Sequence, residues 1–211
     1  MGGALDRRRF GKTGRMVTAV GLGGGEGILR TYGRHAEANA VIMEALDQGG
    51  IAYFDSAKAY AGGSEDYYGE VWRNRPRSQG TGLPGKQVGE QGACGRETDL
   101  TETLQRMGIE TLDLWQIHDV RTFTDIREVE GGPSGALEAF VEARESGIVR
   151  QIGGVTGGHH DPDVLSHAVE TWPVDAVMLP VNPVEEALGG GSWTRRSPPS
   201  HGSRGGSRSS G

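Results

Sequence analysis

The sequence predicts an α/β protein built on a parallel sheet. Short apolar segments alternate with segments of helical periodicity, and glycines end several of the helices. Apolar strands separated by helices are typical of βαβ units, in which the strands run parallel. Polar residues recur where the predicted strands end, at Asp55, His118, Thr156 and Asn182. In a barrel of such units the carboxyl ends of the strands share one face, so these four side chains are expected to converge there.

The first half of the chain supplies two of the predicted strands and the loop with the most distinctive chemistry. A strand that ends in an acid is followed by a small-residue loop carrying Tyr60, and Ser64 with Glu65 then opens a helix. An acid and a tyrosine so placed can face one pocket, although an arbitrary pair at this spacing is more often a turn cap and a half-buried ring. The predicted elements are a small hairpin over 7–14, a strand over 17–22, a helix over 37–48, a strand over 51–54 and a helix from 64 to about 72.

The second half repeats the alternation after one irregular stretch. Residues 78–95 should contain the third strand, yet they hold six glycines, and Leu83 and Val88 are their only branched aliphatic residues. No clear strand is predicted there. The remaining elements are helices over 96–108, 135–147 and 162–172 and strands over 112–117, 148–155 and 176–181.

Composition narrows the class of protein. The 211 residues carry a net charge of −6, and residues 189–211 contribute four arginines and no acid, so the body is more acidic than the whole. An acidic body argues against nucleic acid as the main partner. No apolar run is long enough to span a membrane, and the basic start has no apolar segment typical of a signal peptide. A single cysteine, Cys94, excludes an intrachain disulfide. We therefore expect a cytoplasmic protein with neither membrane nor nucleic-acid partners.

Three other signals are weighed and set aside. The glycines after the first strand fall short of G-x-G-x-x-G because Glu26 takes the last glycine's place. His159, His160 and Asp161 with Asp163 could bind a divalent metal, but a solvated loop is favoured and no metal site is predicted. The Ser/Gly/Arg-rich tail is similar to RNA-contacting segments, but it has few arginines and is predicted to be a disordered, inert tail.

In combination these residues resemble the aldo-keto reductases, a family of TIM barrels that reduce carbonyls with NADPH. The resemblance covers about residues 7–188. Its motifs are Phe10-Gly11-Lys12-Thr13-Gly14, the Phe54-Asp55-Ser56-Ala57 run followed by Tyr60, Ser64-Glu65, the Leu112-Asp113-Leu114 run followed by His118, and Ile152-Gly153-Gly154-Val155-Thr156. The spacing of Asp55, Tyr60, Lys86 and His118 matches the family's catalytic set of four.

The resemblance implies a role for each residue of that set. Tyr60 would donate the proton to the carbonyl oxygen, and Lys86 would stabilise the tyrosinate, since a phenol of pKa about 10 is a weak acid at neutral pH. Asp55 would hold Lys86 charged, and His118 would orient a small carbonyl substrate. The nicotinamide of NADPH would supply the hydride. The cofactor-binding residues implied are Gly23, Gly24, Asp55, Thr156 and Asn182.

The sequence also departs from the family. Lys86 follows Leu83-Pro84-Gly85 where the family has a continuous apolar strand, and Met178 stands where it usually has an amide. The pattern ends after a sixth strand, so we expect an incomplete TIM (β/α)8 barrel of about six βα units over residues 1–188, followed by the tail at 189–211. Residues 78–95 and 189–211 are interpreted as reading-frame slips in a GC-rich gene, which sequencing of the locus would contradict if both stretches proved in frame. The alternative function is a catalytically impaired homologue that acts as a binding or regulatory subunit. Nothing in the sequence indicates an oligomeric state.

Overall fold

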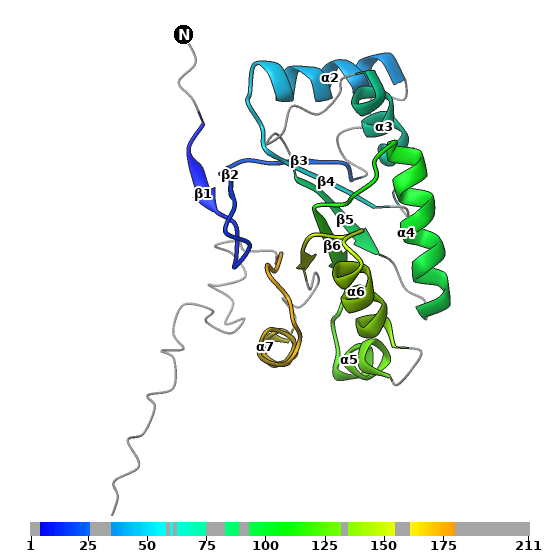
Figure 1. Ribbon diagram of the computed structural model, residues 1–211. Helices are drawn as coiled ribbons and strands as arrows, with labels where there is room; N and C mark the ends of the chain where they lie inside the picture. The colour runs from blue at the N-terminus through cyan, green and yellow to red at the C-terminus, as the bar shows by residue number, and fades with distance from the viewer. Residues whose placement is uncertain are drawn as a thin grey trace, which may run out of the picture.

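The fold is an arc of parallel strands with helices along its outer side (Figure 1). The computed structural model describes residues 5–25, 35–57, 60, 63–74, 83–88, 93–131, 135–154 and 161–179. The main sheet has the order β3-β4-β5-β6-β7, so each strand pairs in parallel with the one before it in the chain. Its strands are β3 (Leu22–Gly23), β4 (Tyr53–Ala57), β5 (Leu83–Val88), β6 (Leu114–Ile117) and β7 (Ile152–Gly153).

Sequential parallel pairing is the winding of a β/α barrel, in which a helix returns the chain between neighbouring strands. A parallel bridge between Gly153 of β7 and Ala176 extends the strand order by one position beyond β7. Ala176 is the first residue of the predicted strand over 176–181. The helices are α2 (His35–Asp47), α3 (Ser64–Asn74), α4 (Ala93–Met107), α5 (Phe123–Glu130), α6 (Ala136–Glu145) and α7 (Pro162–Thr171). Packing of α2 on α3 and of α3 on α4 forms the outer layer beside β3 to β5 (Figure 1).

An amino-terminal hairpin covers the amino end of the sheet. Its strands β1 (Arg7–Arg9) and β2 (Met16–Thr18) pair antiparallel, as the turn-rich start predicts. Three hydrogen bonds join the hairpin to residues just before strands of the sheet. The Lys12 backbone N–H donates to the Asp175 carbonyl at 2.6 Å, and Arg15 Nη1 donates to Asp113 Oδ1 at 2.7 Å. The Ala52 N–H donates to Thr18 Oγ1 at 3.0 Å. The opposite, carboxyl end of the strands remains the place for a site.

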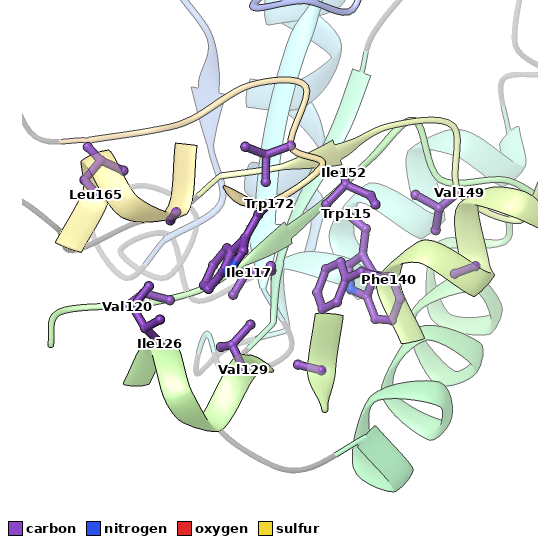
Figure 2. Close-up of a cluster of buried hydrophobic side chains, with 14 of the residues drawn as sticks. Trp115, Ile117, Val120, Ile126, Val129, Phe140, Val149, Ile152, Leu165 and Trp172 are labelled. Carbon is purple, nitrogen blue, oxygen red and sulfur yellow. The ribbon is translucent and has the colours of Figure 1, made fainter. Parts of the chain in front are cut away.

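Two apolar clusters fill the space between the strands and the helices. In the larger one the ring of Trp115 on β6 stacks on Phe140 of α6 with centroids 3.9 Å apart and Ile152 beside it, and Leu165 lies at the other side of the cluster, past Trp172 (Figure 2). In the smaller one Phe54 of β4 meets the ring of Tyr68 edge-on at 5.8 Å. Buried aromatic rings contribute much of the apolar area removed from water in such clusters.

The structure corrects three of the sequence predictions. The predicted strand over 17–22 is two short pieces, because its first residues pair within the hairpin as β2 and only its last residues begin the sheet as β3. Residues 83–88 do form a strand, and Pro84 is tolerated because β5 pairs with β6 only from Gly85 onward. The helix α5 was not predicted; it begins with a capping box between Thr122 and Asp125. The tail at 189–211 lies outside the described residues.

We predict that Phe140→Ala destabilises the fold by about 3–5 kcal/mol, because it removes a fully buried ring that stacks on Trp115 and leaves a cavity. The free energy of unfolding in urea measures the effect. Phe123→Ala is the matched control, since Phe123 is 43% exposed against 1% for Phe140 and should cost less than about 1 kcal/mol. Equal losses in the two variants would show that the cluster is not the core described here.

Candidate active site at the carboxyl end of the strands

Alternation along β4 and β6 separates the side chains into two sets. Phe54 and Trp115 belong to the clusters under the helices. Their neighbours Asp55 and Gln116 point to the other face of the sheet, where the Gln116 Nε2 donates to Asp55 Oδ1 at 2.9 Å. The same amide nitrogen lies 3.4 Å from the Tyr53 hydroxyl. The face that carries the site is therefore the one turned away from the helices.

Asp55 is a buried acid at the centre of this face. Burial raises its pKa to about 7, and the hydrogen bond from Gln116 opposes that rise by stabilising the carboxylate. Its backbone carbonyl accepts from the Gly24 N–H at 2.6 Å, which ties the end of β4 to the end of β3. A carboxyl with a pKa near neutrality changes its charge within the working range of most enzymes.

Tyr60 lies beyond the end of β4 and its side chain is half-buried. Burial raises the pKa of its hydroxyl to about 12, and the negative charge of Asp55 adds to the rise. The ring passes close to the end of β3, where a Cβ built on Gly25 would lie 3.7 Å from Tyr60 Cζ. The structure thus brings Asp55, Tyr60 and the glycines after β3 together, as the sequence predicts for the first two.

His118 stands at the same end of the sheet. It follows β6 directly, two residues after Gln116, and is partly buried. The next residue, Asp119, has φ of 64°, an uncommon value for a residue other than glycine, and its carboxylate accepts from Arg121 Nε at 2.6 Å. The chain therefore turns sharply after His118 instead of continuing the strand.

Lys86 lies on β5, between the strands β4 and β6 that lead to Tyr60 and His118. It is the register partner of Ser56 on β4 and of Trp115 on β6. The predicted role of Lys86 stays a prediction.

The predicted cofactor residues fit a nicotinamide cofactor in part. A Cβ built on Gly23 meets nothing within 4 Å, so backbone at this point is open to a bound molecule. Gly24 has a structural reason for lacking a side chain, because a Cβ there would lie 2.7 Å from the Asp55 carbonyl oxygen. The side chains of Tyr60 and His118 can donate protons and hydrogen bonds but cannot deliver a hydride, which is the chemistry that a nicotinamide adds. Thr156 and Asn182 lie outside the described residues.

Comparison with known proteins shows which family has this sequence and fold. Residues 19–186 match the model of the aldo/keto reductase family. The chain belongs to the aldo/keto reductase family. Among curated relatives, pyridoxal 4-dehydrogenase of Microbacterium luteolum is 27% identical over 83% of this chain and 62% of its own length. The aldo-keto reductase yakc [NADP(+)] of Schizosaccharomyces pombe is 28% identical over 79% of this chain and 50% of its own length.

Solved structures agree on the fold. The aldo-keto reductase AKR2E4 of Bombyx mori, in complex with NADP, superposes with a TM-score of 0.64 at 19% identity, covering 86% of this chain and 60% of that one. This confirms the predicted TIM-barrel type, seen here as an incomplete barrel of parallel strands. The chain spans about half to two thirds of the length of the family members it matches.

The sequence analysis missed Gln116 and Tyr53. Gln116 lies two residues before His118 and Tyr53 two residues before Asp55, so both share the face of a predicted site residue. The period of two along a strand was therefore the signal that could have found them.

In the part of the chain that the structure describes, no three potential metal ligands gather in a cluster. Among the described helices, none combines the length and the apolar character that a membrane crossing requires.

We predict that Asp55→Asn stabilises the protein at high pH. The pKa of Asp55 is raised on folding from 3.8 to about 7, so the folded state holds its proton more tightly and the free energy of unfolding falls as pH rises between those values. The cost is complete above pH 7 and amounts to about 2–4 kcal/mol. Urea unfolding at pH 5 and pH 8 should show this loss in the wild type and a much smaller one in Asp55→Asn.

Asp125→Asn is the control for that experiment. Backbone N–H groups of Arg121 and Thr122 hold the pKa of Asp125 below its usual value despite its slight burial, so its stabilising effect is present at high pH and lost as pH falls. Because that loss begins only below the usual carboxyl pKa of 3.8, Asp125→Asn should leave the stability difference between pH 5 and pH 8 unchanged. A wild-type pH dependence that survives intact in Asp55→Asn would contradict the raised pKa.

Proposed function

We propose that this protein is an NADP-dependent reductase that converts a small carbonyl compound to an alcohol. The observation that carries the proposal is that Asp55 of β4 and Tyr60 beyond β4 interact, on a sheet whose strand β6 is followed by His118 at the same carboxyl end. NADP is supported by the name of the yeast relative and by the NADP complex of the silkworm reductase. An aldehyde or ketone substrate follows from the chemistry of the family.

The proposed mechanism uses Tyr60 as the proton donor. As a hydride reaches the carbonyl carbon, negative charge develops on the carbonyl oxygen, and the Tyr60 Oη–H bond breaks to protonate it. A pKa of about 12 keeps the tyrosine protonated at neutral pH, while the developing alkoxide is more basic still. His118 would donate a hydrogen bond to the same oxygen and fix its position before the proton moves.

Gly23 would allow the backbone to approach the cofactor, and Thr156 and Asn182 are proposed to contact its nicotinamide amide. Asp55 would shape the electrostatic environment of Tyr60, whose pKa it already affects. Lys86 is proposed as the cation of the family's catalytic set, which would stabilise the tyrosinate. A cytoplasmic location and the lack of nucleic-acid partners stay predictions from composition.

A second candidate is a catalytically impaired homologue that binds a ligand or a partner without turnover. The raised pKa of Tyr60, about 12, favours it, because burial and the charge of Asp55 make this hydroxyl a weaker acid than an ordinary tyrosine. Binding of NADPH, measured by the fluorescence of the bound nicotinamide, is common to both candidates. Carbonyl-dependent oxidation of NADPH separates them, since only the reductase shows it.

We predict that Tyr60→Phe lowers kcat by roughly 100- to 10,000-fold, because it removes the proton donor, and leaves NADPH affinity nearly unchanged. Tyr68→Phe is the control. The Tyr68 hydroxyl is fully buried and donates to the Leu22 carbonyl at 3.2 Å, so its loss should cost stability but not the chemical step. Equal turnover in Tyr60→Phe and the wild type would remove Tyr60 from the mechanism.

We predict that Lys86→Met lowers kcat by roughly 100-fold or more, because it removes the cation that the family resemblance assigns to the stabilisation of tyrosinate. The assay is NADPH oxidation with one fixed aldehyde, next to an Arg73→Met variant as a control for loss of a positive charge on α3. A change of less than about threefold in Lys86→Met would remove Lys86 from the mechanism.

A further inference from the structure

Gln116 is a polar residue whose side chain lies almost fully inside the protein. It is 1% exposed, and its amide nitrogen is shared between Asp55 Oδ1 at 2.9 Å and the Tyr53 hydroxyl at 3.4 Å. Only an amide N–H can donate to a carboxylate, so the contact with Asp55 fixes which way the amide points. A buried polar side chain destabilises the folded state unless its hydrogen bonds are made. The shortest hydrogen bond of the Gln116 amide is the one to Asp55, the acid of the proposed site.

A glycine that follows β7 leaves room for this side chain. A Cβ built on Gly154 would press on the Gln116 amide, lying 3.0 Å from its Cδ, and Gly154 also has φ of 49°, a conformation that favours glycine. A Cβ built on Gly153 would meet Leu114 first, 2.6 Å from its Cδ1, and would lie 3.1 Å from Gln116 Cγ. Gly154 therefore leaves the room that the glutamine amide occupies.

The amide acts on Asp55 in a definite direction. Burial drives the carboxyl toward its neutral form, and the hydrogen bond from Gln116 drives it toward the carboxylate. Asp55 in turn raises the pKa of Tyr60, so the charge that Gln116 stabilises faces the proposed proton donor. Gln116, Asp55 and Tyr60 thus form a chain of three side chains that starts at a buried residue of β6.

We propose that Gln116 is a positioning residue of the reductase site, whose amide holds the Asp55 carboxylate in place and ionised beside Tyr60. The proposal rests on the proposed function for its effect on turnover, but not for the coupling between Gln116 and Asp55. The titratable groups that the structure describes around Asp55 include Tyr53 on its own strand, Tyr60 on the following loop, Tyr68 from α3 and His118 after β6. On β5, Lys86 is the register partner of Ser56, the residue that follows Asp55. Burial keeps the pKa values of the three tyrosines raised, so they stay neutral while Asp55 titrates.

The test follows the side-chain carboxyl signal of Asp55 by carbon NMR in the full chain as pH is varied. Gln116→Leu removes the amide and should raise the midpoint of the Asp55 titration by about one pH unit, which is about tenfold in proton affinity. Ser64→Ala is the matched control, because it removes a buried hydrogen bond to the neighbouring Ser56 on the opposite face of β4 and should shift the midpoint by less than about 0.3 unit.

A second variant keeps the test decisive if Gln116→Leu does not fold. Gln116→Glu places another carboxyl next to Asp55, so the pair should titrate in two steps with the upper one above the wild-type midpoint. An Asp55 midpoint that neither Gln116 variant moves, or that Ser64→Ala moves equally, overturns the proposal.

Turnover gives the second readout. Part of the pH profile of kcat/KM should reflect the titration of Asp55. In Gln116→Leu this part should shift along with the NMR midpoint, a shift that a purely structural role of Gln116 would not produce. A profile that stays in place while the midpoint moves overturns the link to Tyr60. Wild-type protein without turnover, but with the expected NMR shifts, overturns the proposed function and supports the coupling of Gln116 to Asp55.

Discussion

The register between neighbouring parallel strands is the constraint on which the site depends. A strand shows its side chains alternately to the two faces of the sheet, so the pairing of β4 with β6 through β5 decides which residues meet inside the barrel. Asp55 and Gln116 come to the inner face because Phe54 and Trp115 are buried under the helices. The apolar core and the polar site are thus two consequences of one register, and neither can shift without the other.

The inner face has an energetic cost that the outer face offsets. A buried carboxyl with a pKa near 7 and three tyrosines whose pKa values are raised by burial form an environment that disfavours charge. The clusters around Trp115 and Phe54 remove large apolar areas from water and stabilise the strands that carry these groups. The amino-terminal hairpin adds contacts at the far end of the strands, where Arg15 pairs with the buried Asp113. The groups that stabilise the sheet therefore lie on its outer face and at its amino end, away from the proposed site.

The sequence predicts most of the fold because its strands and helices carry strong local patterns. The helices at 37–48, 135–147 and 162–172 and the strand that ends at Asp55 are confirmed within a few residues. The helix α5 was missed because it is short and its capping box, not its periodicity, marks its start. The strand β5 was missed because it is defined by the strands on either side and not by its own residues. Gln116 was missed because a single amide in an apolar strand has no motif, and only its alignment with Asp55 reveals it.

The strand without a local pattern is also the strand that joins the two parts of the site. β5 pairs with β4 on one side and with β6 on the other, and Gly85 is the register partner of Asp55. A shift of one residue along β5 would exchange its two faces and would put Lys86 level with Asp55 in place of Gly85. The pairing of β5 therefore holds β4 and β6 in the register from which the Gln116 amide donates to the Asp55 carboxylate.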